Sequence, residues 1–394
     1  MVKFERWVLP EGIEELLPEQ AVRVEHLRRQ VLDLFSSWGY QLVIPPLVEY
    51  MDALIVGAGN DLKRYTFKLV DERNGRLIGV RADMTPQVAR IDAHRLQRSG
   101  SARLCYFGPV LLTQPRQLGG SRSPLQTGAE LYGHPGRESD IEIMRLMLEV
   151  LHKTGVRNPF LDLGHVGIFR GLVEQAKLNK DLENRLFDAL QRKARPEIEE
   201  LVSEVNDNNV ADMFKALIDL NGGEECLAEC KKVLVKANKD VLHALDEVEK
   251  ISASLKQYFP KLRINFDFAE LRGYQYHTGV VFAVYSEGHW QALAQGGRYD
   301  DVGAAFGSSR PATGFSMDIN TLLRVTESRP KTGKGVWAPA ADDINLRQTI
   351  SDLRAKGERV IEELPGIKDT PQELGCDRQL VSQGTQWVIE DLVK

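Results

Sequence analysis

Several stretches of the chain carry apolar residues at helical spacing. An amphipathic helix is expected over residues 19–38, where apolar side chains recur at steps of three and four: Val24, Leu27, Val31, Leu34 and Trp38. Pro18 before this stretch and Gly39 after it are typical helix boundaries. The same kind of spacing predicts further helices over residues 85–99, 138–155 and 317–327.

Other stretches alternate between apolar and polar residues and predict strands. Residues 65–82 are expected to form a hairpin that turns at Asn74-Gly75. The stretch YQLVIPPLVEY contains Pro45 and Pro46, so it is expected at a sheet edge or an interface. Further strands are predicted at residues 103–112, 125–133, 263–268 and 279–285.

The pattern of predicted helices and strands changes along the chain, which indicates more than one domain in its 394 residues. Residues 170–260 are almost wholly helical in pattern and are expected to be an insertion into a core of residues 1–169 and 261–327. The segment 328–335 has the composition of a linker. Residues 336–394 then form a small C-terminal domain, with one helix between short strands.

Charge and composition exclude several classes of protein. The 51 Lys and Arg residues are outnumbered by 56 Asp and Glu residues, so no general attraction to nucleic acid is expected. No apolar run approaches the ~18 residues of a membrane span, and the first residues lack a secretory signal, so we expect a cytoplasmic protein. Cys226 and Cys230 have helical rather than metal-knuckle spacing, so no metal is expected.

Two polar clusters lie at strand ends and are candidates for a binding site. In VRADMT, Asp83 and Thr85 stand between a strand and a helix, where either side chain could simply cap the helix. In LQTGAE, Gln126 and Glu130 share one face of a strand, and a solvated face is the alternative to a site.

A third cluster lies in ELRGYQYHTG, which contains Arg272, Tyr276 and His277. A tight turn with aromatic packing is the plain alternative for this stretch. Phosphate-loop, dinucleotide, zinc-protease and nucleophile-elbow motifs are missing from the sequence. The candidate chemistry therefore rests on these three clusters.

Taken in order over residues 1–325, these stretches resemble the motifs of the histidyl-tRNA synthetase family. GYQLVIPPLVEY is similar to motif 1, and VRADMT and LQTGAE are similar to the ends of motif 2. ELRGYQYHTG resembles the histidine-specific box, and QGGRYDD with ATGFSMDINTL resembles motif 3. The resemblance implies an α+β fold: a class II aminoacyl-tRNA synthetase-like antiparallel sheet flanked by helices, with a helical insertion and a small α/β C-terminal piece.

The resemblance also implies a site for L-histidine. Asp83, Thr85 and Gln126 would hold its ammonium group, Glu130 would bond one imidazole nitrogen, and Arg272 would face its carboxylate. Tyr276 would line the box, and His277 stands where many synthetases have a second tyrosine.

The nucleotide half of the family's site is missing. The arginine that grips the α-phosphate of ATP and the glutamate that helps to hold adenine are replaced by Leu112 and Gln114. In motif 3, a glycine and the second catalytic arginine are replaced by Asp318 and Thr321. Without two cationic clamps, stabilisation of a transferring phosphate is lost, so amino-acid activation is not expected.

A synthetase-like chain with a histidine box and a shortened C-terminus resembles the regulatory subunits of ATP phosphoribosyltransferase. This resemblance implies a non-catalytic subunit that binds a short-form catalytic subunit in the first step of histidine biosynthesis and relays feedback by L-histidine. It implies a hetero-oligomer, expected to be a hetero-octamer, a self-dimer formed through motif 1, and no cofactor. The alternatives are a divergent histidyl-tRNA synthetase, another class II adenylate-forming paralogue, and a scaffold with a vestigial pocket.

Overall fold

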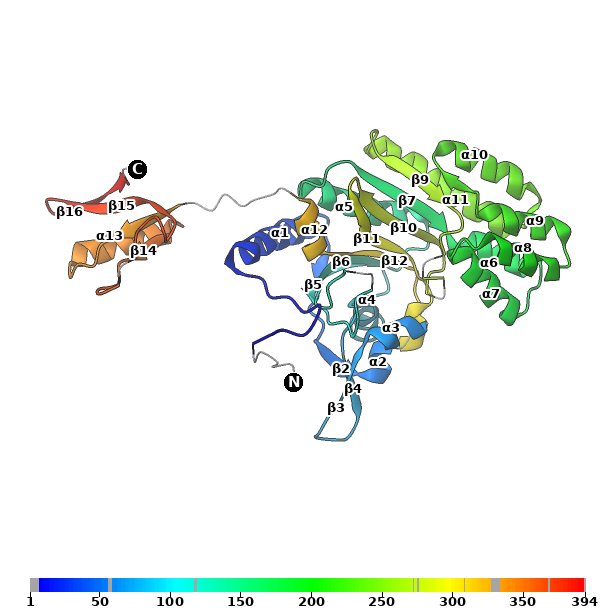
Figure 1. The fold of residues 1–394 in the computed structure, drawn as a ribbon, viewed down its shortest axis with the longest axis horizontal. Coiled ribbons are helices and arrows are strands. Elements are labelled where there is room, and N and C mark those ends of the chain that lie inside the picture. Colours follow the sequence, from blue (N-terminus) through cyan, green and yellow to red (C-terminus); the bar gives the residue numbers. More distant parts are fainter. Residues whose placement is uncertain are drawn as a thin grey trace, which may run out of the picture. The chain divides into compact units, whose positions relative to one another are not determined.

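The computed structural model divides the chain into two units, Met1–Ser328 and Arg329–Lys394 (Figure 1). Of the expected linker at 328–335, only Lys334 and Gly335 are described, and Gly335 already begins a strand. The structure describes residues 7–55, 59–116, 119–271, 273–274, 276–307, 309–326, 334–367 and 369–392.

A nine-stranded sheet forms the centre of the first unit as far as the structure describes it, in the order β1-β5-β6-β12-β11-β10-β7-β9-β8. The pairs β1–β5 and β7–β9 are parallel and the other neighbours are antiparallel. The strands are β1 (Gln41–Leu42), β5 (Ala102–Pro109), β6 (Leu125–Tyr132), β7 (Pro159–His165), β8 (Asn221–Gly222), β9 (Arg263–Asp267), β10 (Val280–Ser286), β11 (His289–Arg298) and β12 (Ala312–Asp318).

This sheet confirms the predicted α+β class with a mainly antiparallel sheet. It also confirms the expected place of the proline-containing stretch, because β1 is an edge strand and Pro45 and Pro46 follow it. Proline lacks the N–H that a central ladder needs, so the chain leaves the sheet here.

Among the helices that pack on the sheet and contribute to the core of the first unit are α1 (Pro18–Ser37), α5 (Arg137–Lys153) and α12 (Ile319–Val325). The apolar stripe of α1 ends in Phe35, whose ring meets that of Phe315 on β12 edge to face, with centroids 6.0 Å apart. The helices predicted at 19–38 and 138–155 are therefore confirmed within two residues at each end.

Strands β11 and β12 were not expected from the sequence, and the helix predicted at 317–327 begins only at Ile319. Met317 and Asp318 belong to the end of β12. The glycines in these strands hide the apolar alternation, yet packing requires them. A Cβ on Gly296 would collide with the carbonyl oxygen of Gly314, so the adjacent backbones leave no room for a side chain there.

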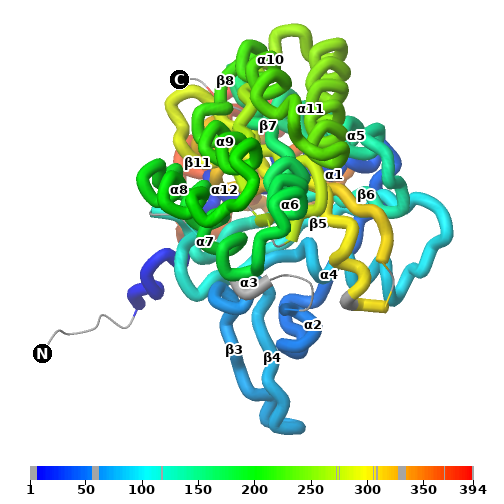
Figure 2. Tube along the Cα trace, turned by 90° about the vertical axis from the view of Figure 1, so that its right-hand side faces the viewer, coloured from blue at the N-terminus to red at the C-terminus, as the bar shows by residue number. Residues whose placement is uncertain are grey.

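The predicted hairpin at 65–82 is confirmed, with β3 (Phe67–Val70) and β4 (Leu77–Val80) paired in a second, three-stranded sheet with β2 (Val48–Tyr50). Gly75 has a φ of 73°, the left-handed conformation that a tight hairpin turn needs. Figures 1 and 2 show the hairpin projecting from its unit, near α2 (Met51–Ile55) and α3 (Gly59–Tyr65).

The helix expected over 85–99 is shorter than predicted. It consists of α4 (Thr85–Arg90) followed by a π-helix, Ile91–Leu96. The π-helix carries the buried Asp92, whose carboxylate accepts two bonds from Arg310 Nη1 at 3.0 and 2.9 Å. A single salt bridge thus ties this helix to the segment before β12.

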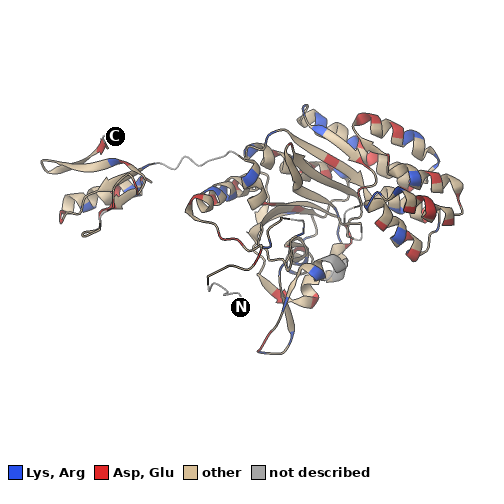
Figure 3. Cartoon of the chain, viewed as in Figure 1, with Lys and Arg blue, Asp and Glu red and all other residues tan. Residues whose placement is uncertain are grey.

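The stretch expected to be a helical insertion forms a group of helices on one side of the sheet, drawn in green in Figures 1 and 2. Two features differ from the prediction: α6 begins at Val166, before the expected boundary at residue 170, and the two-residue strand β8 interrupts the helices and pairs with β9. Figure 3 shows acidic and basic residues interspersed along these helices. The helices are α6 (Val166–Gln175), α7 (Lys180–Gln191), α8 (Arg195–Leu201), α9 (Asn208–Leu217), α10 (Glu224–Val233) and α11 (Lys239–Tyr258), with 3₁₀ turns at Val202–Glu204, Leu234–Lys236 and, later in the chain, Val302–Phe306.

The second unit is a small α/β structure with its own core. A four-stranded sheet in the order β14-β13-β15-β16 packs against one helix, α13 (Ile344–Ala355). The strands are β13 (Gly335–Ala338), β14 (Val360–Glu362), β15 (Cys376–Gln383) and β16 (Gln386–Asp391). Their shared core contains Val336, Leu346, Ile350 and Leu380. Throughout the described residues of both units, we find no helix with the length and apolar character needed to cross a membrane.

Candidate functional site

A cavity of about 740 Å³ opens over the central strands of the first unit. Its floor comes from β10, β11 and β12, and its walls come from residues before α4, after β5 and at the end of α7. Five of the predicted site residues line it, while Arg272 lies outside the described residues. These five are Asp83, Thr85, Glu130, Tyr276 and His277.

One wall of the cavity is built around Asp83. Its Oδ1 accepts bonds from the backbone N–H of Thr85 at 3.0 Å and from Gln126 Nε2 at 2.9 Å. The capping alternative is thus partly correct, since the first bond lies at the start of α4. Gln126 is buried and does not line the cavity, because its amide oxygen also accepts a bond from Met84 N at 2.9 Å. In this arrangement Gln126 fixes the position of Asp83.

The second oxygen of Asp83 faces a cation that the sequence interpretation left without a role. Arg116, on the loop after β5, donates from Nη2 to Asp83 Oδ2 at 3.1 Å and to the carbonyl oxygen of Ala82 at 3.1 Å. Burial by itself raises the pKa of Asp83, but the charge of Arg116 and the bonds from Gln126 and Thr85 outweigh it and lower the pKa. The carboxylate is therefore ionised.

Glu130 lies on the opposite side of Thr85 and is held by hydroxyl groups. Its Oε1 accepts bonds from Thr85 Oγ1 and Tyr106 Oη, both at 3.0 Å, and its Oε2 accepts a bond from Tyr299 Oη. Glu130 is only 1% exposed, so the solvated-face alternative for this strand is wrong. The two tyrosines could not be assigned from the sequence, because only their position beside Glu130 in space gives them a role.

Burial raises the pKa of Glu130 to about 8, although the three hydroxyl bonds oppose the increase. Glycine at position 314 makes room for this carboxyl, because a Cβ there would collide with Glu130 Oε2. Near neutral pH, Glu130 is thus mostly protonated and can give or accept a hydrogen bond.

Tyr276 and His277 form the wall beyond Glu130. The Tyr276 ring stacks on that of Tyr299 with centroids 5.1 Å apart, and its buried hydroxyl has no hydrogen-bond partner among the described residues. His277 Nδ1 lies 3.2 Å from the carbonyl oxygen of Arg298, and burial lowers the pKa of His277 to about 4. A carbonyl can only accept, so the neutral ring carries its proton on Nδ1 and leaves Nε2 as an acceptor.

The lining of the cavity contains more acidic than basic side chains. Arg116 is the only lysine or arginine among the described lining residues. Asp267, for example, forms a 2.8 Å ion pair with Lys193. A triphosphate would meet like charge along these walls, whereas a ligand with an ammonium group would meet opposite charge. The lining carboxyl groups belong to Asp83, Glu130, Asp162, Asp188, Asp267 and Glu270.

The two predicted clamp replacements after β5 are engaged elsewhere and do not line this cavity. Leu112 is 2% exposed and packs in a small apolar cluster with Leu62, Ala82 and Tyr65. Gln114 lies beside Arg64, whose Nε is 2.7 Å from the amide oxygen in the orientation that satisfies both groups. Apolar packing thus accounts for the leucine at position 112.

Asp318 and Thr321, the two replacements in motif 3, form hydrogen bonds that stabilise the start of α12. Asp318 caps α12 by accepting from Asn320 N at 3.1 Å, and it also accepts from Leu125 N at 3.1 Å. Thr321 Oγ1 donates to its other oxygen at 2.9 Å. Burial raises the pKa of Asp318, against the effect of these bonds. No cationic side chain stands at either position.

Comparison with known proteins identifies the family. The Histidyl-tRNA synthetase family model matches residues 12–322, and the ATP phosphoribosyltransferase subunit HisZ C-terminal domain model matches residues 333–390. An ATP phosphoribosyltransferase regulatory subunit from Pseudomonas entomophila is 52% identical over 391 residues, which is 99% of this chain and 99% of that protein. The chain belongs to the ATP phosphoribosyltransferase regulatory subunit family. The regulatory subunit of Thioalkalivibrio sulfidiphilus is 51% identical over 100% of both chains.

Solved structures agree with this regulatory subunit family. A Bacillus halodurans protein described as an ATP phosphoribosyltransferase regulatory subunit/histidyl-tRNA synthetase has a TM-score of 0.82 and 27% identity, over 94% of this chain and 96% of that one. A histidyl-tRNA synthetase from Nostoc sp. has a TM-score of 0.75 at 16% identity, over 98% of this chain and 94% of that one, and shows the shared fold alone.

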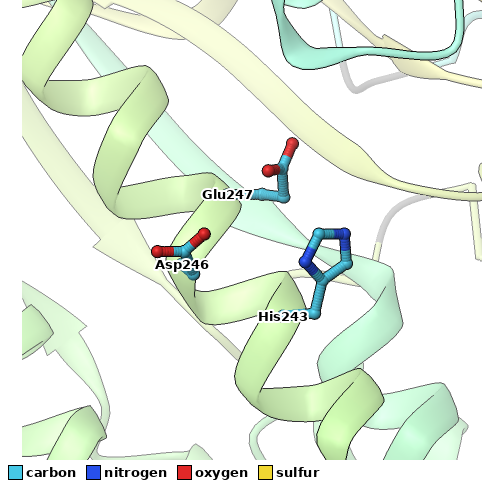
Figure 4. A group of neighbouring side chains, drawn as sticks. All are labelled: His243, Asp246 and Glu247. Carbon is cyan, nitrogen blue, oxygen red and sulfur yellow. The ribbon is translucent and has the colours of Figure 1, made fainter.

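Among the residues that the structure describes, this regulatory subunit family member also carries a group of possible metal ligands on α11, formed by His243, Asp246 and Glu247 (Figure 4). Both carboxylates already have cationic partners. Arg137 lies 2.8 Å from Glu247, and Lys250 lies 2.6 Å from Asp246. A metal ion would have to displace these partners, so we do not assign a metal site to the group.

Proposed function

We propose that this chain is the regulatory subunit of a cytoplasmic ATP phosphoribosyltransferase, acting in the first step of histidine biosynthesis and without catalytic activity of its own. The observation that carries the proposal is the identity of about half of all residues with regulatory subunits over the full length of both chains. The match of residues 333–390 to the C-terminal domain of that subunit supports it further.

L-Histidine is the proposed ligand of the acidic cavity. The ionised Asp83, together with the Thr85 hydroxyl, offers acceptors for an α-ammonium group. Across Thr85, protonated Glu130 and the Nε2 acceptor of His277 offer opposite hydrogen-bonding roles to an imidazole ring. Arg272 would hold the carboxylate, as the resemblance to synthetases implies, and no cofactor is needed.

The same cavity argues against amino-acid activation. Leucine at 112 and threonine at 321 offer no charged donor to a phosphate, and Leu112 is packed against apolar neighbours. The acidic lining adds like-charge repulsion for ATP. A pocket that binds histidine without consuming it would act as a sensor, provided that histidine binds one conformation of the complex better than another.

A self-dimer through the first motif is part of the proposal. The edge strand β1 and the segment after it expose apolar side chains, with Ile44 80% exposed and Leu42, Leu47 and Val48 between 38 and 48% exposed. A second copy of the chain would cover this surface, and dimers would then carry the catalytic subunits in a hetero-oligomer.

Co-purification with a short-form catalytic subunit tests the proposal. We expect a stable complex whose phosphoribosyltransferase activity exceeds that of the catalytic subunit alone and falls when L-histidine is added. Failure to form the complex would refute the proposal. Histidine-dependent exchange between ATP and pyrophosphate by the isolated chain would instead favour a divergent synthetase.

A further inference from the structure

The ion pair between Arg116 and Asp83 occupies the part of the cavity where the proposed ligand would place its ammonium group. Asp83 has two carboxylate oxygens, and Oδ1 is already held by Gln126 and by the N–H of Thr85. Oδ2 receives Arg116. Any cationic group that binds Asp83 from the cavity therefore has to compete with this guanidinium.

The two partners are held very differently. The side chain of Asp83 is 19% exposed and is held by two bonds that do not involve Arg116, whereas the side chain of Arg116 is 38% exposed. The two bonds of the Arg116 guanidinium, to Asp83 Oδ2 and to the Ala82 carbonyl, come from one nitrogen, Nη2. The Arg116 side chain can thus turn into solvent without disturbing the core, while Asp83 stays in place.

We propose that Arg116 is a built-in competitor that sets the affinity of the cavity for ligands carrying an α-ammonium group. The inference rests on the proposed histidine site and deepens it. In the empty chain, the guanidinium neutralises Asp83. A ligand ammonium group takes its place at Oδ2, and Arg116 turns out into solvent. The free energy of the ion pair is then subtracted from that of ligand binding.

If Arg116 instead helped to bind the ligand, its removal would have the opposite effect on affinity. If its guanidinium instead bound the carboxylate of the ligand, loss of the charge would weaken binding. A half-exposed ion pair of this kind is weak, so a competitor would lower the affinity by about threefold to tenfold. The direction of the change separates the two roles.

Titration calorimetry on the full chain with L-histidine, histamine and imidazolepropionate provides the test. Arg116→Gln removes the competing charge, and Arg116→Lys keeps it. Arg122→Gln is the matched control, because Arg122 lies on the same loop but donates to the carbonyls of Leu112 and Glu11 rather than to Asp83. We expect Arg116→Gln to bind L-histidine and histamine about threefold to tenfold more tightly than the wild-type chain, with Arg116→Lys close to the wild type.

Imidazolepropionate has no ammonium group, so its affinity is expected to stay unchanged in Arg116→Gln. If the wild-type chain binds L-histidine and Arg116→Gln binds it equally or more weakly, Arg116 does not compete with the ligand. The proposed function would still stand in that case. An equal gain in affinity for L-histidine in Arg122→Gln would also refute the proposal that Arg116 competes for Asp83. If neither the wild type nor Arg116→Gln bound L-histidine, the proposed histidine site and the competition by Arg116 would both be refuted, whereas binding by Arg116→Gln alone would support the competition.

Discussion

Glu130 makes the stability of the first unit depend on pH in a way that one substitution removes. Its pKa is about 8 in the folded chain, against an ordinary value of 4.5 that we take for the unfolded chain. At about 1.4 kcal/mol per pKa unit, ionising Glu130 in the folded chain costs about 5 kcal/mol more than in the unfolded chain. The residue is 1% exposed, so solvent does not screen this difference.

The direction of this pH dependence follows from the number of protons that the folded and the unfolded chain bind. Between pH 4.5 and about 8, the folded chain keeps the proton on Glu130 while the unfolded chain has lost it, so the free energy of unfolding falls as pH rises. The full contribution is present below pH 4.5 and is lost by about pH 8. Glu130→Gln keeps the shape of the neutral acid but cannot ionise.

Guanidinium chloride unfolding at pH values from 5.5 to 7.5, followed by circular dichroism, measures this effect. We expect the wild-type chain to lose about 1 kcal/mol per pH unit relative to Glu130→Gln. Glu72→Gln, at an exposed residue of the β3–β4 turn, is the control and is expected to follow the wild type. Parallel curves for the wild type and Glu130→Gln would refute the reasoning.

Three further predictions concern the cavity and its support. Affinity for L-histidine is expected to be highest between about pH 6.5 and about 8, where Glu130 and the ligand imidazole share one proton, and calorimetry across pH would show a flat profile if this is wrong. Gly314→Ala, whose methyl group would collide with the Glu130 carboxyl, is expected to lower that affinity at least tenfold while circular dichroism stays unchanged; normal binding would contradict this. Arg298→Ala removes the 2.9 Å partner of the buried Asp140, so we expect a loss of about 3–5 kcal/mol of stability in denaturant unfolding, and a loss below 1 kcal/mol would show that the pair contributes little.

The sequence was most informative where a single element determines its own pattern. The apolar stripe of α5 and the Asn74-Gly75 turn are local signals, so both elements were predicted correctly. Strands β11 and β12 were missed, because Gly296 and Gly314 are dictated by neighbouring strands that only the folded sheet brings together. The α4 helix was predicted too long, since its continuation as a π-helix has no periodic signature.

In the candidate site, too, some features follow from local sequence patterns and others arise only in the folded chain. Asp83 and Glu130 stand in recognisable motifs and line the cavity, whereas Arg116 and Tyr299 contact these residues only through side-chain contacts made in three dimensions. Gln126 is expected to bind the ligand ammonium group, and in the structure its amide bonds Asp83 and the backbone N–H of Met84. Sequence patterns thus locate the cavity and leave the division of labour among its residues to the structure.

The packing of Leu112 has a consequence for attempts to convert this chain into an enzyme. Its side chain is 2% exposed and shares an apolar cluster with Leu62 and Ala82, so an arginine placed there would bring a charge among apolar neighbours that offer it no hydrogen-bond partner. Such a substitution would disrupt this packing, and we expect it to destabilise the fold around position 112 rather than to create a phosphate-binding group. Any return to nucleotide chemistry would need several neighbours to change together, which makes the present arrangement hard to reverse one residue at a time.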